Sequence, residues 1–417
     1  MSDPGVGLML APEVAWLERL EPAIEQDVDY YAVTPETLWA PGPGSALVAN
    51  GYHRCFAALR ERTRRPFVAH SVGMSLGGVD PSEEPRRAAF VERMRADHAI
   101  FDFAWWTDHL GLVSAAGSYL ALPLPLPSTR AAASAVCRVL ASMREVVPRV
   151  GVENSALYFA WGDPLDEPAL LHACIADERS HVLLDLHNLW TSARNLGFDP
   201  DAWLARIDLS RVIEIHVSGG SESPREWLPD DRSLRLDSHD DAVPEPVWDL
   251  LERVVPRCPA LRGVTLERME GTVDAPDVAV VRDELRRIRD VVTSAAVKFC
   301  PVPDLTTSAA VKSCPVPNLT EGGGVGELRE REQALAALMS GGALDADGVE
   351  LARLLVARLR FDRLLAGSRT AAALYDADGA AFAETFRRYA AEVRPTAFFP
   401  HDEGAFFEAW AGASPAH

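Results

Sequence analysis

Eight short apolar segments, each followed by a stretch with helical periodicity, dominate residues 1–292 of this 417-residue chain. The predicted strands are Val6–Leu10, Asp29–Val33, Pro66–Ala69, Trp105–Asp108, Arg149–Glu153, Val182–Asp185, Val212–His216 and Gly263–Glu267. Strands that alternate with helices form parallel sheets, and eight such units predict an α/β fold of the (β/α)8 barrel type. A doubly wound open sheet is the alternative, which is disfavoured because no GxGxxG motif follows the first strand.

A tandem repeat follows the predicted barrel. Thr293–Thr306 reads TSAAVKFCPVPDLT, and Thr307–Thr320 reads TSAAVKSCPVPNLT. Two prolines per unit without apolar periodicity indicate an extended linker, which we place at residues 293–325. The repeated Cys300 and Cys314 fit two hypotheses: they belong to an incidentally duplicated tether, or they reach the barrel mouth in cis as pseudo-substrates.

Residues 326–417 show helical periodicity, with predicted helices at Leu328–Leu338, Val349–Leu365 and Ala380–Val393. The tail that follows, Pro395–Trp410, is dense in aromatic side chains. These side chains either pack the core of a small all-α domain or form a docking surface for a partner or peptide. A small all-α domain is therefore predicted after the linker.

The charge balance argues against nucleic acid or a membrane as the main partner. The chain carries 41 basic and 61 acidic residues, a net charge of −20, which disfavours contact with anionic surfaces. The N-terminus has no basic n-region, and no apolar run reaches the roughly 20 residues that a spanning helix needs. The six cysteines are scattered without CxxC spacing, which disfavours a disulfide scaffold. We expect a cytoplasmic protein.

Imidazole and carboxylate groups close six consecutive predicted strands. The carboxyl ends of barrel strands meet at one mouth, so these side chains are expected to converge there. The predicted metal ligands are His70, His109, Glu153, Asp185, Asn188, His216, Asp237, His239 and Glu267. Such groups are the ligands that iron, zinc and manganese prefer. Because nine ligands exceed what one ion binds, the sequence predicts a multinuclear metal centre.

The other histidines are less informative. His187 is ambiguous: it lies two residues after Asp185, on the same side of an extended strand, whereas Asn188 begins a turn. Four more lie within or beside helical patterns and are expected to be surface or core residues: His53, His98, His172 and His181.

Seven ordered motifs resemble one known family. They read HSVGMSLGG, DHLGL, VENS, LLDLHNLWTSARNLGF, EIHVSGG, LDSHDDAVPEPVWDLLE and TLERMEG, and they span roughly residues 5–290. They resemble the DUF692 family of multinuclear non-heme iron-dependent oxidases, typified by the methanobactin biosynthesis enzyme. The resemblance implies a xylose-isomerase-like TIM barrel that holds two or three iron ions. It also implies O₂-dependent oxidation of a ribosomally made precursor peptide, often at cysteine.

Enzymes of this family commonly work with a small partner protein that presents the leader of the peptide, and residues 326–417 resemble such a partner fused in cis. The chain also departs from the family pattern. The family commonly has Asn at the position of His187, His at the position of Gly220, and Trp-Asp where Arg268 and Met269 follow Glu267. The expected ligands are kept, so these departures concern the groups around the metal centre.

Two other classes of function remain as alternatives. The ordered ligands also resemble the tri-zinc endonucleases that cleave at abasic DNA sites and, more loosely, the sugar isomerases that share the barrel. The net charge of −20 argues against a nuclease, and Asn188 stands where that family has a His. A non-catalytic binding protein is the other alternative.

Overall fold

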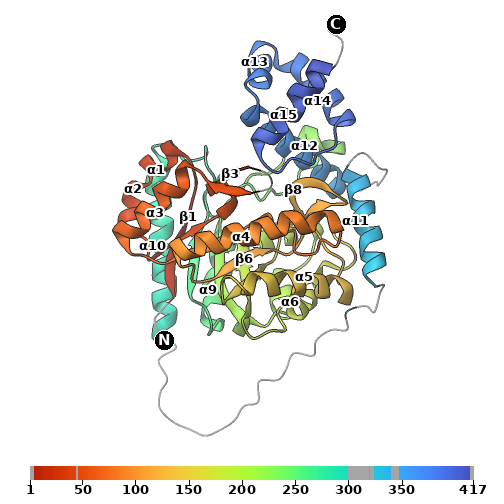
Figure 1. Cartoon of the computed structure of the whole chain (residues 1–417). Helices are drawn as coiled ribbons and strands as arrows, with labels where there is room; N and C mark the ends of the chain where they lie inside the picture. The colour runs from red at the N-terminus through yellow and green to blue at the C-terminus, as the bar shows by residue number, and fades with distance from the viewer. Residues whose placement is uncertain (1–3, 44–45, 299–318, 320–323, 340–346, 414–417) are drawn as a thin grey trace.

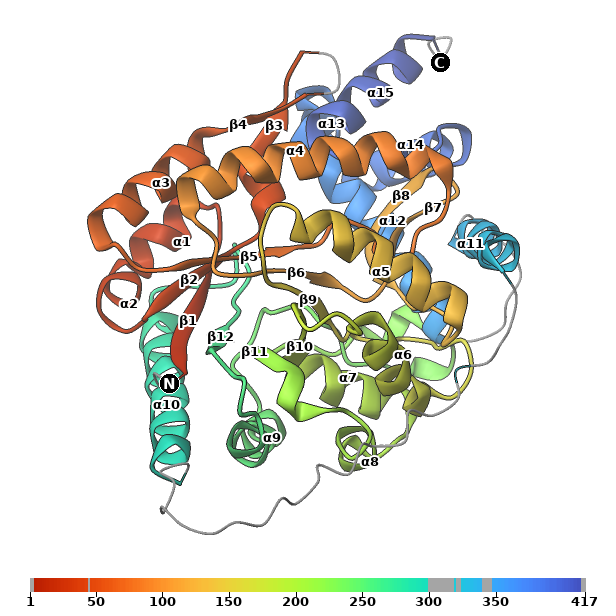
Figure 2. The same cartoon turned by 60° about the horizontal axis from the view of Figure 1, so that its bottom comes forward.

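The computed structural model describes residues 4–43, 46–298, 319, 324–339 and 347–413. Eight parallel strands form a closed barrel in the order β1-β12-β11-β10-β9-β6-β5-β2 (Figures 1 and 2). They are β1 Gly5–Leu10, β2 Tyr30–Val33, β5 Phe67–Ser71, β6 Trp106–His109, β9 Val150–Glu153, β10 Ser180–Asp185, β11 Val212–Val217 and β12 Gly263–Leu266. The predicted barrel is thus confirmed, and each predicted strand matches a barrel strand to within two residues at either end.

A layer of large side chains fills the barrel below its mouth. The phenol ring of Tyr30 crosses the interior, and its hydroxyl lies 2.6 Å from the Thr265 hydroxyl. Residues 7 and 263 must be glycine here, because a Cβ atom on Gly7 or Gly263 would lie 2.3 or 2.4 Å from atoms of Tyr30. The interior is therefore a packed core, and only the carboxyl ends of the strands leave room for a site.

Helices cover the outside of the barrel (Figure 2). They are α1 Val14–Arg19, α2 Glu21–Gln26, α3 Gly51–Thr63, α4 Glu84–Phe101, α5 Arg130–Arg144, α6 Glu167–Cys174, α7 Leu186–Leu196, α8 Pro200–Leu204, α9 Glu245–Val254 and α10 Asp277–Lys298. Helical periodicity over Pro12–Glu25 predicts one helix there, but the structure has two, α1 and α2. Pro22 in the first turn of α2 has no N–H to continue the α1 hydrogen bonds, which favours a new start.

Two antiparallel hairpins were not predicted. The first pairs β3 (Trp39–Pro41) with β4 (Leu47–Ala49). Helical periodicity over Ala46–Arg62 predicts a helix from residue 46, but α3 begins only at Gly51 because β4 occupies residues 47–49. The second pairs β7 (Leu112–Ala115) with β8 (Ser118–Leu124) and follows β6 directly. It therefore stands at the carboxyl end of the barrel, beside the mouth.

Within the part of the chain that the structure describes, five helices come after α10: α11 Val325–Met339, α12 Asp347–Gly367, α13 Arg369–Ala377, α14 Gly379–Glu392 and α15 Pro400–Ala413. Helix α10 continues to Lys298 and includes the first residues of the predicted linker. Cys300 and Cys314 lie outside the described residues. The aromatic side chains of the tail pack in two places. Phe407 is buried in the core of α12–α15, whereas Phe398 packs on Tyr119 of β8, with 4.8 Å between ring centroids.

The C-terminal helices contact the barrel near its mouth (Figure 1). Glu332 of α11 accepts hydrogen bonds from the backbone N–H of Val79, at 3.0 Å, and of Ala116, at 3.2 Å. Leu351 of α12 is buried with Tyr158 and Leu228, which belong to the loops after β9 and β11. These loops extend from strands that end in predicted ligands.

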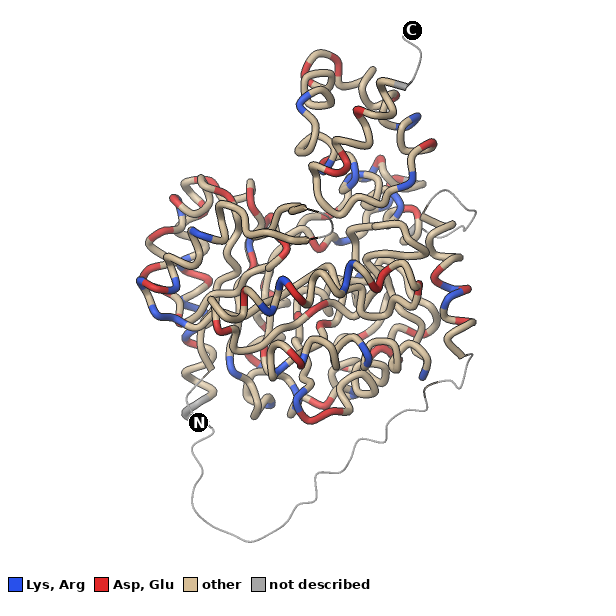
Figure 3. Tube along the Cα trace, viewed as in Figure 1, with Lys and Arg blue, Asp and Glu red and all other residues tan. Residues whose placement is uncertain are grey.

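Acidic and basic residues are interspersed along the outer helices (Figure 3). Several form ion pairs, such as Arg253 with Asp201 at 2.6 Å and Arg289 with Asp29 at 2.9 Å. Among the helices that the structure describes, none combines the length and the apolar character needed to cross a membrane.

Candidate metal centre

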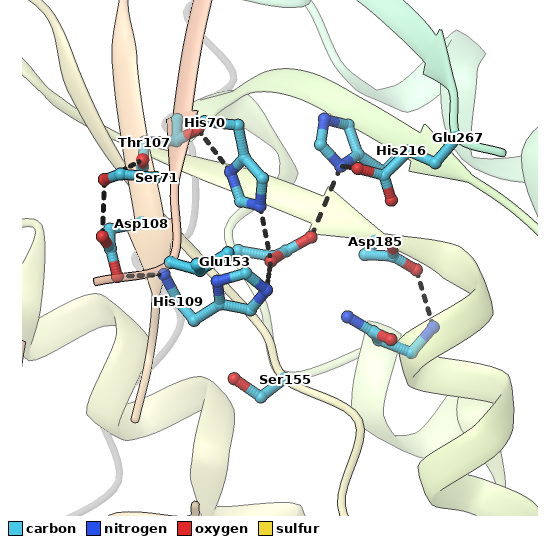
Figure 4. Close-up of polar contacts among 12 residues, drawn as sticks. His70, Ser71, Thr107, Asp108, His109, Glu153, Ser155, Asp185, His216 and Glu267 are labelled. Carbon is cyan, nitrogen blue, oxygen red and sulfur yellow. Dashed lines mark hydrogen bonds and ion pairs between the residues drawn. The ribbon is translucent and has the colours of Figure 1, made fainter. Parts of the chain in front are cut away.

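The predicted ligands converge at the carboxyl ends of the barrel strands (Figure 4). They come from six neighbouring strands. His70 is the last inward-facing residue of β5, and His109, Glu153 and Asp185 are the last residues of β6, β9 and β10. His216 lies on β11, and Glu267 directly follows β12. All but His109 are buried, and His109 keeps 13% of its side chain exposed. The parallel register explains the convergence, because His109 pairs with Glu153 and Asp185 pairs with His216.

Glu153 lies at the centre of a first cluster. Its Oε2 atom is 2.8 Å from His109 Nε2 and 3.3 Å from His70 Nε2, and its Oε1 atom is 3.5 Å from His216 Nδ1. Ligand atoms of His70, Glu153 and His216 all lie within 4.8 Å of one another. This group could hold a metal ion.

A second cluster shares His216 with the first. Asp185, His216 and Glu267 also offer ligand atoms within 4.8 Å of one another, and His216 Nδ1 lies 3.1 Å from Glu267 Oε1. The two groups are therefore adjacent and could hold neighbouring ions. When two ions lie this close, one shared ligand can contact both of them.

Several buried polar atoms here have no hydrogen-bond partner among the described residues. They include Nδ1 of His109, Oδ2 of Asp185 and Oδ1 of Asn188. Buried polar groups are normally paired, because an unpaired one loses its hydration without compensation. Their concentration at the mouth fits a bound cation, and imidazole nitrogens with carboxylate oxygens are a donor set that suits iron.

The buried charges perturb one another strongly. Burial by itself would lower the pKa of His109, but the neighbouring Glu153 carboxylate raises it to about 9. Burial raises the pKa of Asp185 well above its usual value, and the carboxylates of Glu153 and Asp237 add to that effect. A cation bound among these carboxylates would offset the repulsion between them.

Surrounding residues fix the orientation of the candidate ligands. Thr107 Oγ1 lies 2.9 Å from His70 Nδ1, so the other ring nitrogen of His70 faces Glu153. Asp108 accepts a hydrogen bond from the backbone N–H of His109 at 2.8 Å. Asn154 does not point into the centre but pairs with the backbone of Asp185 through two hydrogen bonds of 2.9 Å. Such contacts hold ligands in place before an ion binds.

Glu214 is a buried carboxylate at this site that the sequence analysis missed. It lies on β11 below the candidate ligands, with Oε1 3.3 Å from His216 Nε2. It accepts hydrogen bonds from Trp105 Nε1 and Thr265 Oγ1, both at 2.6 Å. The signal in the sequence was its position two residues before His216, which places both side chains on one face of the strand.

The remaining predicted residues lie beside the second cluster. Asp237 Oδ1 is 2.7 Å from His239 Nε2, and His239 Nε2 is 3.6 Å from Glu267 Oε2. Asn188, in the first turn of α7, donates its backbone N–H to Asp185 Oδ1 at 2.6 Å. The structure thus brings all nine predicted residues together.

The centre opens into a cavity of about 240 Å³. Its polar wall includes His70, His109, Asp237, His239 and Glu267, and much of its apolar wall comes from the end of β1, the segment after β1 and the segment after β12. Two histidines expected to be structural lie elsewhere: His53 Nε2 is 2.9 Å from Asp97, and His172 accepts the backbone N–H of Asp208.

A parallel barrel with imidazoles and carboxylates gathered at one mouth defines a (β/α)8 protein whose site could hold metal ions. Residues 5–293 match the family profile of the RiPP precursor modification enzymes MbnB/TglH/ChrH, where RiPP denotes a ribosomally synthesised and post-translationally modified peptide. The chain belongs to this family of enzymes, and the resemblance inferred from its motifs is confirmed. The match ends before α11.

Relatives of known sequence include uncharacterised proteins of the UPF0276 group. One from Rhizorhabdus wittichii is 33% identical over 268 residues, which cover 64% of this chain and 87% of the relative. Another, from Anaeromyxobacter sp., is 32% identical over 277 residues, or 66% of this chain and 88% of the relative. Among solved structures, endonuclease IV from Thermus thermophilus aligns with 70% of this chain and 100% of its own, at 20% identity and a TM-score of 0.44.

Proposed function

We propose that this protein is an iron- and O₂-dependent oxidase that modifies a ribosomally made precursor peptide, with cysteine as the reacting residue. The observation that carries the proposal is the cluster of buried histidines and carboxylates at the mouth of a barrel that belongs to the MbnB/TglH/ChrH family. Bound iron would supply the redox chemistry that O₂ reduction requires. The protein would supply the positions of the ions and the access of the peptide.

The ligands of two or three irons would be His70, His109, Glu153, Asp185, Asn188, His216, Asp237, His239 and Glu267. Glu153 is suited to contact two ions, because its Oε2 atom faces His70 and His109 while its Oε1 atom faces His216. The His70 ring is held by Thr107, and Asp108 fixes the backbone of His109, so little reorganisation is needed when ions enter.

The cavity beside the centre would receive the reacting segment of the peptide. Met9 and Leu10 at the end of β1 and Pro12 after it form part of the wall, and Met269 lies on the wall after β12. These apolar groups would pack against the peptide, while Thr34 offers a hydroxyl to its backbone. A segment with a small side chain such as cysteine fits a cavity of about 240 Å³.

We further propose that the chain has a barrel domain at 1–292, a linker at 293–325 and a peptide-recruiting domain at 326–417. Support comes from the position of α12, which packs on Tyr158 and Leu228 in loops that begin at the mouth. A leader held by α12–α15 would keep the reacting segment near the cavity at high effective concentration.

The test uses full-length protein purified without O₂ and loaded with ferrous ion. Short cysteine-containing peptides encoded beside its gene would be added, and O₂ uptake and peptide mass would be recorded. We expect O₂ uptake with a peptide mass change, both absent in a His216→Ala variant. Protein that retains only zinc and nicks DNA at abasic sites would contradict the proposal and support the nuclease alternative.

A further inference from the structure

His187 has an unusual environment for a buried histidine. It lies in the first turn of α7 with its side chain fully buried, and its Nε2 atom has no hydrogen-bond partner among the described residues. A buried polar nitrogen without a partner loses its hydration without compensation, so the position of this imidazole needs a physical explanation. His53, buried to a similar extent, shows the usual solution, with its Nε2 atom 2.9 Å from Asp97.

The surroundings of His187 direct it toward two other candidate ligands. Its Nδ1 atom lies 3.4 Å from Asp237 Oδ1, and that same oxygen lies 2.7 Å from His239 Nε2. The position of the imidazole depends on Gly220, because a Cβ atom there would lie 3.1 Å from His187 Cε1. Trp190 of the same helix packs against the ring, with 6.0 Å between ring centroids.

The loop that carries Asp237 and His239 is fixed by its own contacts. Ser238 accepts the backbone N–H of Ser221 at 2.9 Å and donates to Asp240 at 2.8 Å. His239 adopts a left-handed φ of 50°, which a residue with a side chain rarely occupies. Such a conformation costs about 1–3 kcal/mol and persists where the surroundings hold it, often at functional sites.

Two imidazoles and one carboxylate are the set that binds ferrous ion in many non-heme iron proteins, where it leaves positions open for other ligands. Asp237 and His239 each keep 20% of their side chains exposed and line the cavity. An ion held by these residues would therefore be accessible from the cavity. This place borders the second His216 cluster, because His239 Nε2 lies 3.6 Å from Glu267 Oε2.

We propose that His187 is a metal ligand and that, with Asp237 and His239, it holds one ion beside those around His216. This inference rests on the proposed metal centre and adds a ligand that the motif analysis left ambiguous. The competing explanation is that His187 only orients Asp237. That explanation leaves His187 Nε2 buried without a partner and predicts no change in the number of bound ions when His187 is replaced.

The experiment counts ions in the full chain. Wild type, His187→Ala and His187→Leu would be loaded with ferrous ion without O₂ and analysed for iron per chain; titration with cobalt(II), followed by its visible absorption, would resolve the steps. We expect both variants to lose about one equivalent, or to bind it at least about 10-fold more weakly, while the remaining steps are kept. His53→Ala, which removes a buried imidazole outside the centre, should bind the wild-type number of ions.

The Leu variant also separates ligation from folding. Leu fills a similar volume without a buried polar group, so the metal-free variant should be at least as stable as metal-free wild type. Asp237→Ala should lose the same equivalent, and the double variant His187→Leu/Asp237→Ala should lose no more than either single one. An unchanged number and affinity of ions in His187→Leu would overturn the inference.

The outcome is independent of the peptide chemistry. If no peptide is oxidised but His187→Leu lacks one equivalent, the proposed oxidase function fails and the ligand assignment stands. If peptide is oxidised and His187→Leu keeps every ion, only the ligand assignment fails.

Discussion

The Nε2 atom of His216 lies 3.3 Å from Oε1 of Glu214, while its Nδ1 atom faces Glu267 at 3.1 Å. Glu214 is held in place by hydrogen bonds from Trp105 and Thr265. A fixed carboxylate at Nε2 favours the tautomer with its proton on that atom, which leaves the Nδ1 lone pair for an ion. Glu214 is therefore expected to act on the metal centre through His216, although it is not a candidate ligand.

Glu214→Gln is predicted to weaken the binding of ferrous ion by about 10–100-fold, which is the usual effect of removing a residue that contacts and orients a metal ligand. The amide still offers an oxygen to Trp105 or Thr265, so folding should be kept. Chelator competition measures the affinity, and thermal unfolding checks the fold. Asp97→Asn is the control, because Asp97 is a buried carboxylate that contacts Trp39 and His53 away from the centre. Equal losses in both variants would exclude a specific role for Glu214.

His70→Ala, His216→Ala and Glu267→Ala are each predicted to abolish activity and to reduce the iron content. His216→Ala should have the largest effect, because both clusters use this residue. Each substitution should weaken iron binding by more than the roughly 10–100-fold expected when a residue that only orients a metal ligand is replaced. Iron per chain and turnover are the measurements. His98→Ala and His172→Ala should keep wild-type iron, and full iron in all three ligand variants would show that the assignment is wrong.

We expect the buried carboxyl group of Glu36 to make the free energy of unfolding depend on pH. Burial raises its pKa to about 7, and the Asp108 carboxylate contributes to the rise. Since the unfolded chain ionises this group near pH 4.5, the folded state binds more protons between pH 4.5 and 7. The contribution of Glu36 is therefore greatest below pH 4.5 and is lost as the pH rises through 7, by up to about 3 kcal/mol.

Glu36→Gln removes this pH dependence of the free energy of unfolding, because an amide does not ionise. The amide oxygen can still accept hydrogen bonds from the backbone N–H groups of Val72 and Gly73. Urea unfolding of chelator-treated protein at pH 5 and pH 8 measures the difference between wild type and variant. We expect the variant to gain stability relative to wild type at the higher pH. A difference that stays constant between the two pH values would contradict the raised pKa.

The barrel and its strand-end residues could be predicted because local pattern and topology specify them together. Alternation along a strand sets which side chains point inward, and a closed parallel barrel brings all carboxyl ends to one mouth. Residues such as His70 and Glu153 needed no further information. Glu214 was missed because its importance depends on Trp105, which is 109 positions away in the sequence.

His187 stayed ambiguous for a different reason. It lies in the first turn of α7, which directly follows β10, and the direction of a side chain in a first turn depends on how the helix leaves the strand. The two hairpins were missed because short strands that pair only with each other have little periodicity. Contacts of the C-terminal helices could not be predicted, since Glu332 bonds residues that lie 253 and 216 positions earlier.

Glu332 links the C-terminal helices to two loops at the barrel mouth. Its carboxylate is buried and accepts the backbone N–H of Val79, in the loop after β5, and of Ala116, in the β7–β8 turn after β6. Those loops continue from the strands that carry His70 and His109. Glu332→Ala leaves two N–H groups without their acceptor, and each unsatisfied buried donor costs about 1–3 kcal/mol.

We therefore predict that Glu332→Ala lowers the thermal midpoint, speeds hydrogen exchange at the amides of Val79 and Ala116, and weakens iron binding. Glu330→Ala is the matched control, because Glu330 is exposed on the same helix and should change none of the three. Faster exchange at those two amides with unchanged iron affinity would mean that α11 stabilises the loops without influencing His70 and His109. Slow exchange retained at both amides would contradict the contact itself, because their protection would then not depend on the Glu332 carboxylate.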